Sequence, residues 1–227
     1  MLEIVDKIPV ILNALPYILQ GGVVTLITVI GSLALGFCIG LPLAVLQVYG
    51  PSFIRRIIGV YVWFFRGMPI LLLLFLFYFG LFEVIGLNLS TITASCLVLG
   101  MASAAYQSQI FRGSIETLPV GQFRAARALG ARPRDVFFKV ILPGAMPFIF
   151  TGLQISMGYA WFSLVAGEML AGEYGLGYLI WNSFMLVQYP VIIIAMITLG
   201  VIGSLSSLLI RMIGNRLMQW KVREEVR

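Results

Sequence analysis

Residues 112–139 read R-G-S-I-E-T-L-P-V-G-Q-F-R-A-A-R-A-L-G-A-R-P-R-D-V-F-F-K, a polar and basic stretch inside an apolar chain. Long runs without any charged residue surround it, namely 8–54, 84–111, 140–167 and 174–210. These runs are continuous rather than alternating, and a helix needs about 20 apolar residues to cross a membrane. Because only helices and closed barrels satisfy their backbone groups in lipid, the pattern predicts an all-α polytopic membrane protein.

The composition agrees with this fold class. Of 227 residues, 60% are hydrophobic and 11% are charged, which is not typical of a soluble domain. We expect one membrane domain over residues 1–227, with a short interfacial helix over 1–21 and a short helix or re-entrant segment over 172–184. The five predicted transmembrane helices cover residues 22–48, 57–82, 91–111, 147–166 and 190–213.

Basic residues set the expected orientation, because cytoplasmic loops are enriched in lysine and arginine. The segments before the first predicted span and after the second and fourth contain one basic residue, Lys7. The other 14 of the 15 follow the first, third and fifth spans, with Arg66 counted with the first group. The N-terminus is therefore expected outside and the C-terminus in the cytoplasm. With no nucleic-acid motif, the net charge of +6 indicates topology and attraction to anionic lipid.

The polar stretch forms the core of a predicted cytoplasmic loop over residues 113–143. Strong helix formers over 122–129 predict a short helix, and Gly130 is a natural terminator because glycine adopts a left-handed conformation at low cost. Asp135 favours the start of a second helix that returns to the membrane. The small residues beside exposed arginines suit docking into a groove on a partner protein. The alternative is an amphipathic loop that rests on lipid headgroups.

Several motifs carry a resemblance to a known family. The segment G-Q-F-R-A-A-R-A-L-G at 121–130, followed after nine residues by V-I-L-P, resembles the EAA loop of ABC importer permeases. The stretches at 15–26, 64–81 and 103–115 resemble the polar amino acid subfamily of these permeases. The segment G-Y-A-W-F-S-L-V-A-G-E-M-L-A-G-E-Y-G-L-G-Y-L-I at 158–180 is closer to permeases for sulfonates, nitrate and similar anions.

The resemblance implies the type I importer permease fold and an ATPase-coupling site in the loop. It transfers that role to Gln122, Arg124, Ala125, Ala126, Arg127, Ala128, Leu129, Gly130 and Pro143. Arg124 stands where the motif has its glutamate, and Gln109 stands where the amino acid subfamily usually has an acid.

The same resemblance implies the partners. Two ATPase subunits, which bind ATP and Mg²⁺, would sit on the loops, and a second permease, identical or paralogous, would complete the pathway. An extracytoplasmic solute-binding protein would deliver the solute, and this chain would bind no cofactor itself. A multi-pass position in the prokaryotic inner membrane follows. The expected solute is a polar amino acid, and the alternative is a sulfonate, nitrate or another small anion.

Polar side chains in the predicted spans are candidates for the solute pathway, since ionisable groups at membrane depth are costly. Arg66 either serves the pathway or extends back to the inner interface. Tyr159 and Ser163 share a helix face that either lines a pathway or packs against a neighbour. Glu168 and Glu173 form an outer gate, dock the binding protein or are solvated loop acids. The pathway candidates are Arg66, Gly67, Tyr106, Gln109, Tyr159, Ser163 and Glu168.

The residue types and motifs that the sequence lacks argue against several classes of function. The chain has no histidine, no H-E-x-x-H or G-x-S-x-G motif and no phosphate-binding G-x-x-x-x-G-K-[ST] loop, so we do not expect an enzyme. An intramembrane enzyme would need a nucleophile or a carboxylate pair in a span. Cys38 and Cys96 both lie in predicted spans, which predicts neither a disulfide nor a metal site. A non-transporting scaffold or channel is the alternative class.

Overall fold

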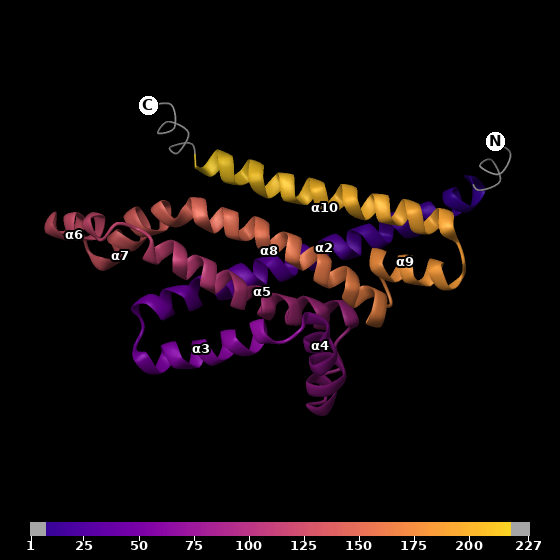
Figure 1. The fold of residues 1–227 in the computed structure, drawn as a ribbon, viewed down its shortest axis with the longest axis horizontal. Helices are drawn as coiled ribbons and strands as arrows, with labels where there is room; N and C mark the ends of the chain where they lie inside the picture. The colour runs from indigo at the N-terminus through magenta and orange to yellow at the C-terminus, as the bar shows by residue number, and fades with distance from the viewer. Residues whose placement is uncertain (1–7, 219–227) are drawn as a thin grey trace.

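The computed structural model describes residues 8–218, and every regular element in that range is helical (Figure 1). The predicted all-α class is therefore confirmed for the described residues. The elements are α2 (Ile8–Tyr49), α3 (Ser52–Gly67), α4 (Ile70–Phe75), η1 (Leu76–Phe82), α5 (Thr91–Glu116), α6 (Val120–Ala128), α7 (Pro133–Val136), η2 (Phe137–Ile141), α8 (Leu142–Ala171), α9 (Leu176–Met185) and α10 (Tyr189–Leu217), of which η1 and η2 are π-helical.

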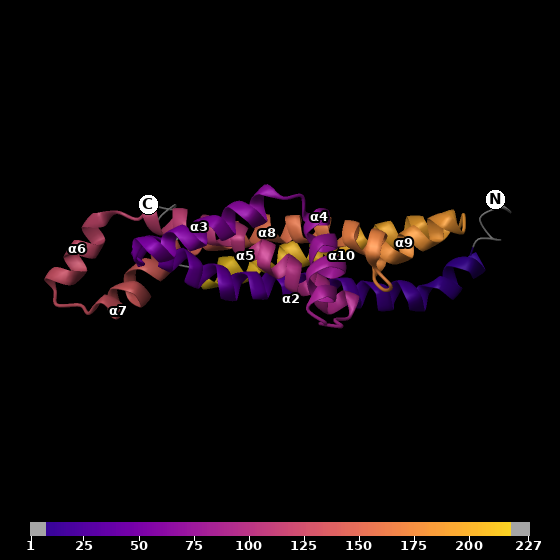
Figure 2. The ribbon, with the colours of Figure 1, turned by 90° about the horizontal axis from the view of Figure 1, so that it is seen from below.

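Four long helices, α2, α5, α8 and α10, run along an elongated bundle (Figures 1 and 2). Helices α6 and α7 lie at one end, whereas α9 and the start of α2 lie at the other. Among the described basic residues, all but Arg66 belong to segments at or toward the α6 end. The structure thus gathers the basic residues at one end, but which end faces the cytoplasm remains a prediction from charge.

The contact between α2 and α5 holds the centre of the bundle, and it depends on small residues. A Cβ at Gly36 would lie 2.6 Å from Ser103 Oγ, and a Cβ at Gly40 would lie 3.1 Å from the Ala104 carbonyl oxygen. The fully buried Gln107 occupies the space beside them and donates from Nε2 to Ser103 Oγ at 2.8 Å. Glycine allows the two backbones to approach closely, as is common between membrane helices.

The first predicted boundary is wrong, because no break separates an interfacial helix over 1–21 from a span over 22–48. Helix α2 runs without interruption from Ile8 to Tyr49 and includes Pro16 and Pro42. A proline removes one hydrogen bond from a helix, but in an apolar segment the neighbouring backbone groups have no other partners. Residues 1–7 of the predicted interfacial helix lie outside the described residues.

The second predicted span, 57–82, is not one straight helix. Helix α3 ends at Gly67, and the pair formed by α3 and the Ile70–Phe82 segment is bent by 109°. Met68 is extended (φ −97°, ψ 141°) because the ring of Pro69 disfavours a helical conformation in the preceding residue. We refer to residues 66–70 as the elbow.

Judged by length and hydropathy alone, the number of membrane-spanning helices is lower than the five predicted. Three described helical segments are long and apolar enough to cross a membrane, or four if the bent pair counts as one span. Helix α5, at 26 residues, is long enough but contains more polar side chains and is not among them. The count of five spans therefore stays a prediction.

The predicted loop over 113–143 is largely helical and joins directly to the fourth predicted span. Helix α5 continues to Glu116, and one apolar helical segment runs from Pro133 to Met169. The second loop helix is thus the beginning of the 147–166 span rather than a separate helix along the surface. Pro143 has no N–H, and the adjacent π-helical turn, in which Leu142 N donates to the Phe137 carbonyl oxygen, accommodates it.

One smaller expectation is confirmed, because the segment 172–184 includes most of the short helix α9. Cys38 and Cys96 are both free thiols in the structure.

Candidate functional site

Helix α6 has no buried residue, and most of its side chains are exposed. Two side chains, Phe123 and Ala126, pack against the hydrophobic cluster beneath it. The remaining helix residues predicted to couple to an ATPase point away from the protein, and Leu129, which follows the helix, is 88% exposed. The outward-facing residues are Gln122, Arg124, Ala125, Arg127, Ala128 and Leu129. Ala126 therefore lies on the inner face of α6, which the sequence pattern did not distinguish.

Gly130 terminates α6 as predicted. Its φ is +79°, its N–H donates to the Arg127 carbonyl oxygen at 2.9 Å, and Ala131 N donates to the Ala126 carbonyl oxygen at 3.1 Å. These two hydrogen bonds form a Schellman motif, which favours glycine at the left-handed position. The turn fixes the angle at which α6 leaves the bundle.

The cluster beneath α6 connects it to three long helices. Its buried members are Ala44 of α2, Phe111 and Ile115 of α5, Val136 of α7, Ile141 of η2, and Ala145 and Ile149 of α8. Pro143 lies half-buried at the start of α8. Because packed interiors transmit strain, a force on α6 would reach α2, α5 and α8 through this cluster.

The surface around α6 is basic. Arg124, Arg127, Arg132 and Arg134 are exposed. The nearby acids already have partners, because Lys139 Nζ lies 2.8 Å from Asp135 Oδ1 and Arg112 Nε lies 2.9 Å from Glu116 Oε1. Among the residues that the structure describes, the four arginines have no acidic partner, and this end therefore presents positive charge.

A second group of candidates meets at the elbow. The Arg66 guanidinium carbon lies 5.1 Å from the centroid of the Tyr106 ring, a cation–π distance. The rings of Tyr106 and Tyr159 have centroids 4.8 Å apart. We call these three residues the Arg66 cluster. Gly67 is the next residue at the elbow, and Ser163 follows Tyr159 by one turn on α8.

Two other pathway candidates have partners elsewhere. Gln109 donates from Nε2 to Gln47 Oε1 at 2.8 Å and so joins α5 to α2. Neither Gln109 nor Glu168 has a contact with the Arg66 cluster among the interactions of the described residues.

Glu168 is buried, with 7% of its surface exposed, and is not a solvated loop acid. Its Oε2 accepts from Gly177 N at 2.9 Å and from Thr25 Oγ1 at 3.1 Å. Thr25 Oγ1 also accepts from Leu176 N at 2.9 Å. The carboxyl group thus joins α8, α2 and the first turn of α9, where the helix dipole favours an acidic side chain. We call this the Glu168 junction, and the sequence pattern missed its partners.

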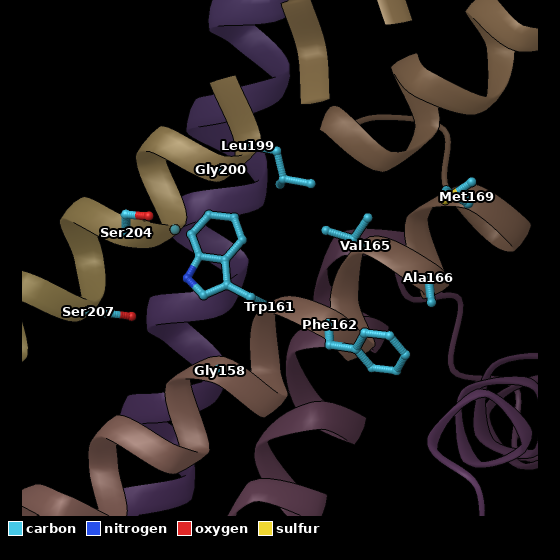
Figure 3. A pocket seen from close by; sticks show the side chains of 11 residues that line it. Gly158, Trp161, Phe162, Val165, Ala166, Met169, Leu199, Gly200, Ser204 and Ser207 are labelled. Carbon is cyan, nitrogen blue, oxygen red and sulfur yellow. The ribbon is translucent and has the colours of Figure 1, made fainter. Parts of the chain in front are cut away.

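Helices α8 and α10 enclose an apolar groove with a volume of about 610 Å³ (Figure 3). Trp161 lies across it and donates from Nε1 to Ser206 Oγ at 3.0 Å. Ser204 and Ser207 line the α10 side, and no charged residue lines the groove. Trp161 and Tyr159 therefore serve different faces of α8, as their spacing predicted.

A bundle of long apolar helices with a basic, exposed helix at one end is typical of a multi-pass membrane protein. The model of the family described as "Binding-protein-dependent transport system inner membrane component" matches residues 36–221. The chain belongs to this family of ABC transporter permeases, so it is a transport subunit rather than an enzyme.

Curated relatives carry transport names. A probable ABC transporter permease protein of Brucella abortus (strain 2308) is 29% identical over 86% of this chain and 75% of its own length. The taurine transport system permease protein TauC of Escherichia coli (strain K12) is 30% identical over 80% of this chain and 63% of its own. A nitrate import permease protein of Leptolyngbya laminosa is 36% identical over 46% of this chain and 37% of its own.

Solved structures share the fold. A chain in a crystal structure of an amino acid ABC transporter with histidines superposes with a TM-score of 0.73, at 24% identity over 92% of this chain and 95% of that chain. A chain in an inward-facing structure of the MetNI methionine ABC transporter gives a TM-score of 0.75, at 23% identity over 91% and 97% of the two chains.

Proposed function

We propose that this chain is the permease subunit of an ATP-driven importer that receives a small solute with an anionic group from a binding protein. The observation that carries the proposal is α6, a basic helix with an exposed outer face, fixed by the Gly130 turn. Its inner face packs, through Phe123 and Ala126, onto the hydrophobic cluster to which α2, α5 and α8 contribute. Such a helix suits a protein partner better than lipid headgroups, because its exposed face is rich in alanine as well as arginine.

In the proposed assembly, two permease subunits pair around a pathway, and two ATPase subunits that bind ATP and Mg²⁺ contact the α6 segments. A solute-binding protein docks at the α9 end, outside the inner membrane of a prokaryotic cell. The five spans would be α2, the bent α3–η1 unit, α5, α8 and α10. Helix α5 tolerates its polar residues because α2 and α8 cover them.

The mechanism follows from the packing. Closure of the ATPases would move α6, and Phe123 and Ala126 would transmit the movement to α2, α5 and α8. Packed helices shift between discrete arrangements rather than deforming continuously, so the bundle would alternate between two states of access. Solute and nucleotide would each bias the same equilibrium.

Two solute classes remain candidates. The sequence motifs over 15–26, 64–81 and 103–115 favour a polar amino acid, and the solved amino acid transporter shares the fold. The relatives named for taurine and nitrate favour a sulfonate or another small anion. We favour the second class, because the relatives with these names match this chain in sequence, the taurine permease at 30% identity over 80% of it. An anionic group is common to both.

The test is the ATPase activity of the purified complex with binding proteins loaded with taurine, nitrate or histidine. Stimulation by a taurine- or nitrate-loaded protein supports the proposed solute class, and stimulation only by a histidine-loaded protein supports the amino acid alternative. If no ATPase co-purifies with this chain, the importer assembly is wrong.

A further inference from the structure

Arg66 stands apart from the other basic residues of the described chain. It lies 14 residues after Ser52, the first residue of α3, which corresponds to about 21 Å along the helix. Figure 1 shows that α3 begins near the α6 end and finishes near the middle of the bundle, where α4 turns away. Arg66 is thus separated from the basic end by most of α3, too far to extend back to it.

No carboxylate neutralises Arg66 among the described residues. Glu116 and Asp135 pair with Arg112 and Lys139. Glu168 is occupied in its junction by Thr25 and Gly177. The guanidinium group carries a permanent positive charge, and an unpaired charge at membrane depth is costly.

The aromatic contact leaves the hydrogen-bonding capacity of Arg66 intact. The guanidinium carbon of Arg66 lies over the Tyr106 ring, and Tyr159 of α8 contacts Tyr106. A guanidinium group has five N–H donors. Among the described residues, the arginine side chains that donate hydrogen bonds are Arg55 and Arg112, not Arg66. The Arg66 side chain is exposed, so its N–H donors are available to a ligand. Carboxylate and sulfonate oxygens match the fork of an arginine.

Ser163 lies on the same face of α8 as Tyr159, which it follows by four residues. It is fully buried and so forms part of the packing behind Tyr159.

We propose that the Arg66 cluster forms the site in this subunit that receives the anionic group of the solute. The proposal rests on the proposed function, because it assumes that a solute passes beside α3, α5 and α8. Arg66 supplies the charge, Tyr106 and Tyr159 hold its side chain at the elbow, and the bend at Pro69 keeps α4 away from it. A solute without an anionic group gains nothing from this charge.

The test uses the complete complex in proteoliposomes with its binding protein, and measures uptake of taurine, nitrate or histidine, whichever stimulates the wild-type ATPase. Arg66→Gln is expected to lower uptake below saturation about tenfold or more, because hydrogen bonds to a charged group are strong. Arg66→Lys keeps the charge and is expected to retain more uptake than Arg66→Gln. The matched control is Arg56→Gln, the same change in the same helix at its exposed, basic end.

A second pair of variants covers the case in which Arg66→Gln does not assemble. Tyr106→Phe keeps the ring and is expected to preserve uptake, whereas Tyr106→Leu removes the support of Arg66 and is expected to lower it. Uptake and basal ATPase activity should both stay at the wild-type level in the Arg56→Gln control.

Wild-type uptake in both Arg66→Gln and Tyr106→Leu would overturn this inference alone. The importer proposal itself is the one overturned if the wild-type complex shows neither uptake nor ATPase stimulation with any of the three solutes.

Discussion

Two short helices, α6 and α9, lie at opposite ends of the bundle, and they differ in how much of their surface is buried. Helix α6 has no buried residue, and arginines project from it. Helix α9 buries Leu176, Gly177 and Ser183, and the Glu168 junction holds its first turn. Both helices end in the same type of turn, but the left-handed position is Gly130 after α6 and Val187 after α9. The difference agrees with the proposed role of α6 as a contact surface, whereas α9 is anchored to the bundle by its buried first turn.

The largest expected loss of stability is at Gly175, and it can be compared with the loss at Gly130, which also has a positive φ. Gly175, with φ +111°, precedes α9, and a Cβ there would overlap the carboxyl group of Glu168. We expect Gly175→Ala to destabilise the subunit by more than about 3 kcal/mol, because strain and overlap add. In Gly130→Ala only the backbone cost of about 1 kcal/mol applies, since nothing lies within 4 Å. Apparent melting temperatures in detergent measure both, and equal losses would contradict the comparison.

Replacement of the buried Glu168 should cause the second-largest loss of stability. Glu168→Leu leaves Gly177 N–H without a partner and removes the link to Thr25, which we expect to cost about 2–3 kcal/mol. The control is Glu116→Leu, which breaks an exposed pair with Arg112 and should cost less than about 0.5 kcal/mol. Thermal unfolding of the two variants compares them, and an unchanged melting temperature in Glu168→Leu would show that the junction does not hold α9.

Adjacent alanines on α6 test the contacted surface. Ala125 is exposed and Ala126 packs inward, so Ala126→Asp should lower stability by about 1–2 kcal/mol through partial burial of a polar group. Ala125→Asp should leave the melting temperature unchanged but abolish the ATPase stimulation by a loaded binding protein. Both quantities are measured on the purified complex. Full stimulation in Ala125→Asp would exclude the outer face of α6 from the ATPase contact.

The smallest expected effect is a gain in stability at the α9 turn. Val187 has φ 58°, which is unfavourable for a β-branched residue, and it is 61% exposed. Val187→Gly should relieve this strain and stabilise the subunit by about 0.5–1 kcal/mol after the greater chain entropy of glycine is subtracted. A rise in the melting temperature is the expected readout, and a fall would mean that the Val187 side chain contributes contacts that outweigh the strain.

The local features of α6 could be predicted because they depend on neighbours in the chain. Helix formers between Pro119 and Gly130 mark the helix, and the glycine marks its end. The orientation of Ala126 toward the cluster could not be predicted, because it depends on residues of α2, α5 and α8. The bend at Pro69 was not predicted, because the sequence was interpreted as one span over 57–82. The extended conformation of Met68 in the structure shows the bend.

Contacts between residues far apart in the sequence were even harder to predict. Tyr106 and Tyr159 were candidates from the sequence, but their contact joins residues that are 53 positions apart. The partners of Glu168 include Thr25, which is 143 positions away. Pairings of this kind depend on how helices pack, and a single sequence contains no periodic signal for them.

The central claim, that α6 is the ATPase-contacting surface, has a direct test in the labelling of Leu129, which is 88% exposed in this chain. In a chain whose Cys38 and Cys96 are replaced by alanine, Leu129→Cys should react with a maleimide in the isolated subunit and be protected in the assembled complex. Glu173→Cys, on the exposed turn at the opposite end, should react equally in both states. Equal labelling of Leu129→Cys with and without the ATPase would contradict the account.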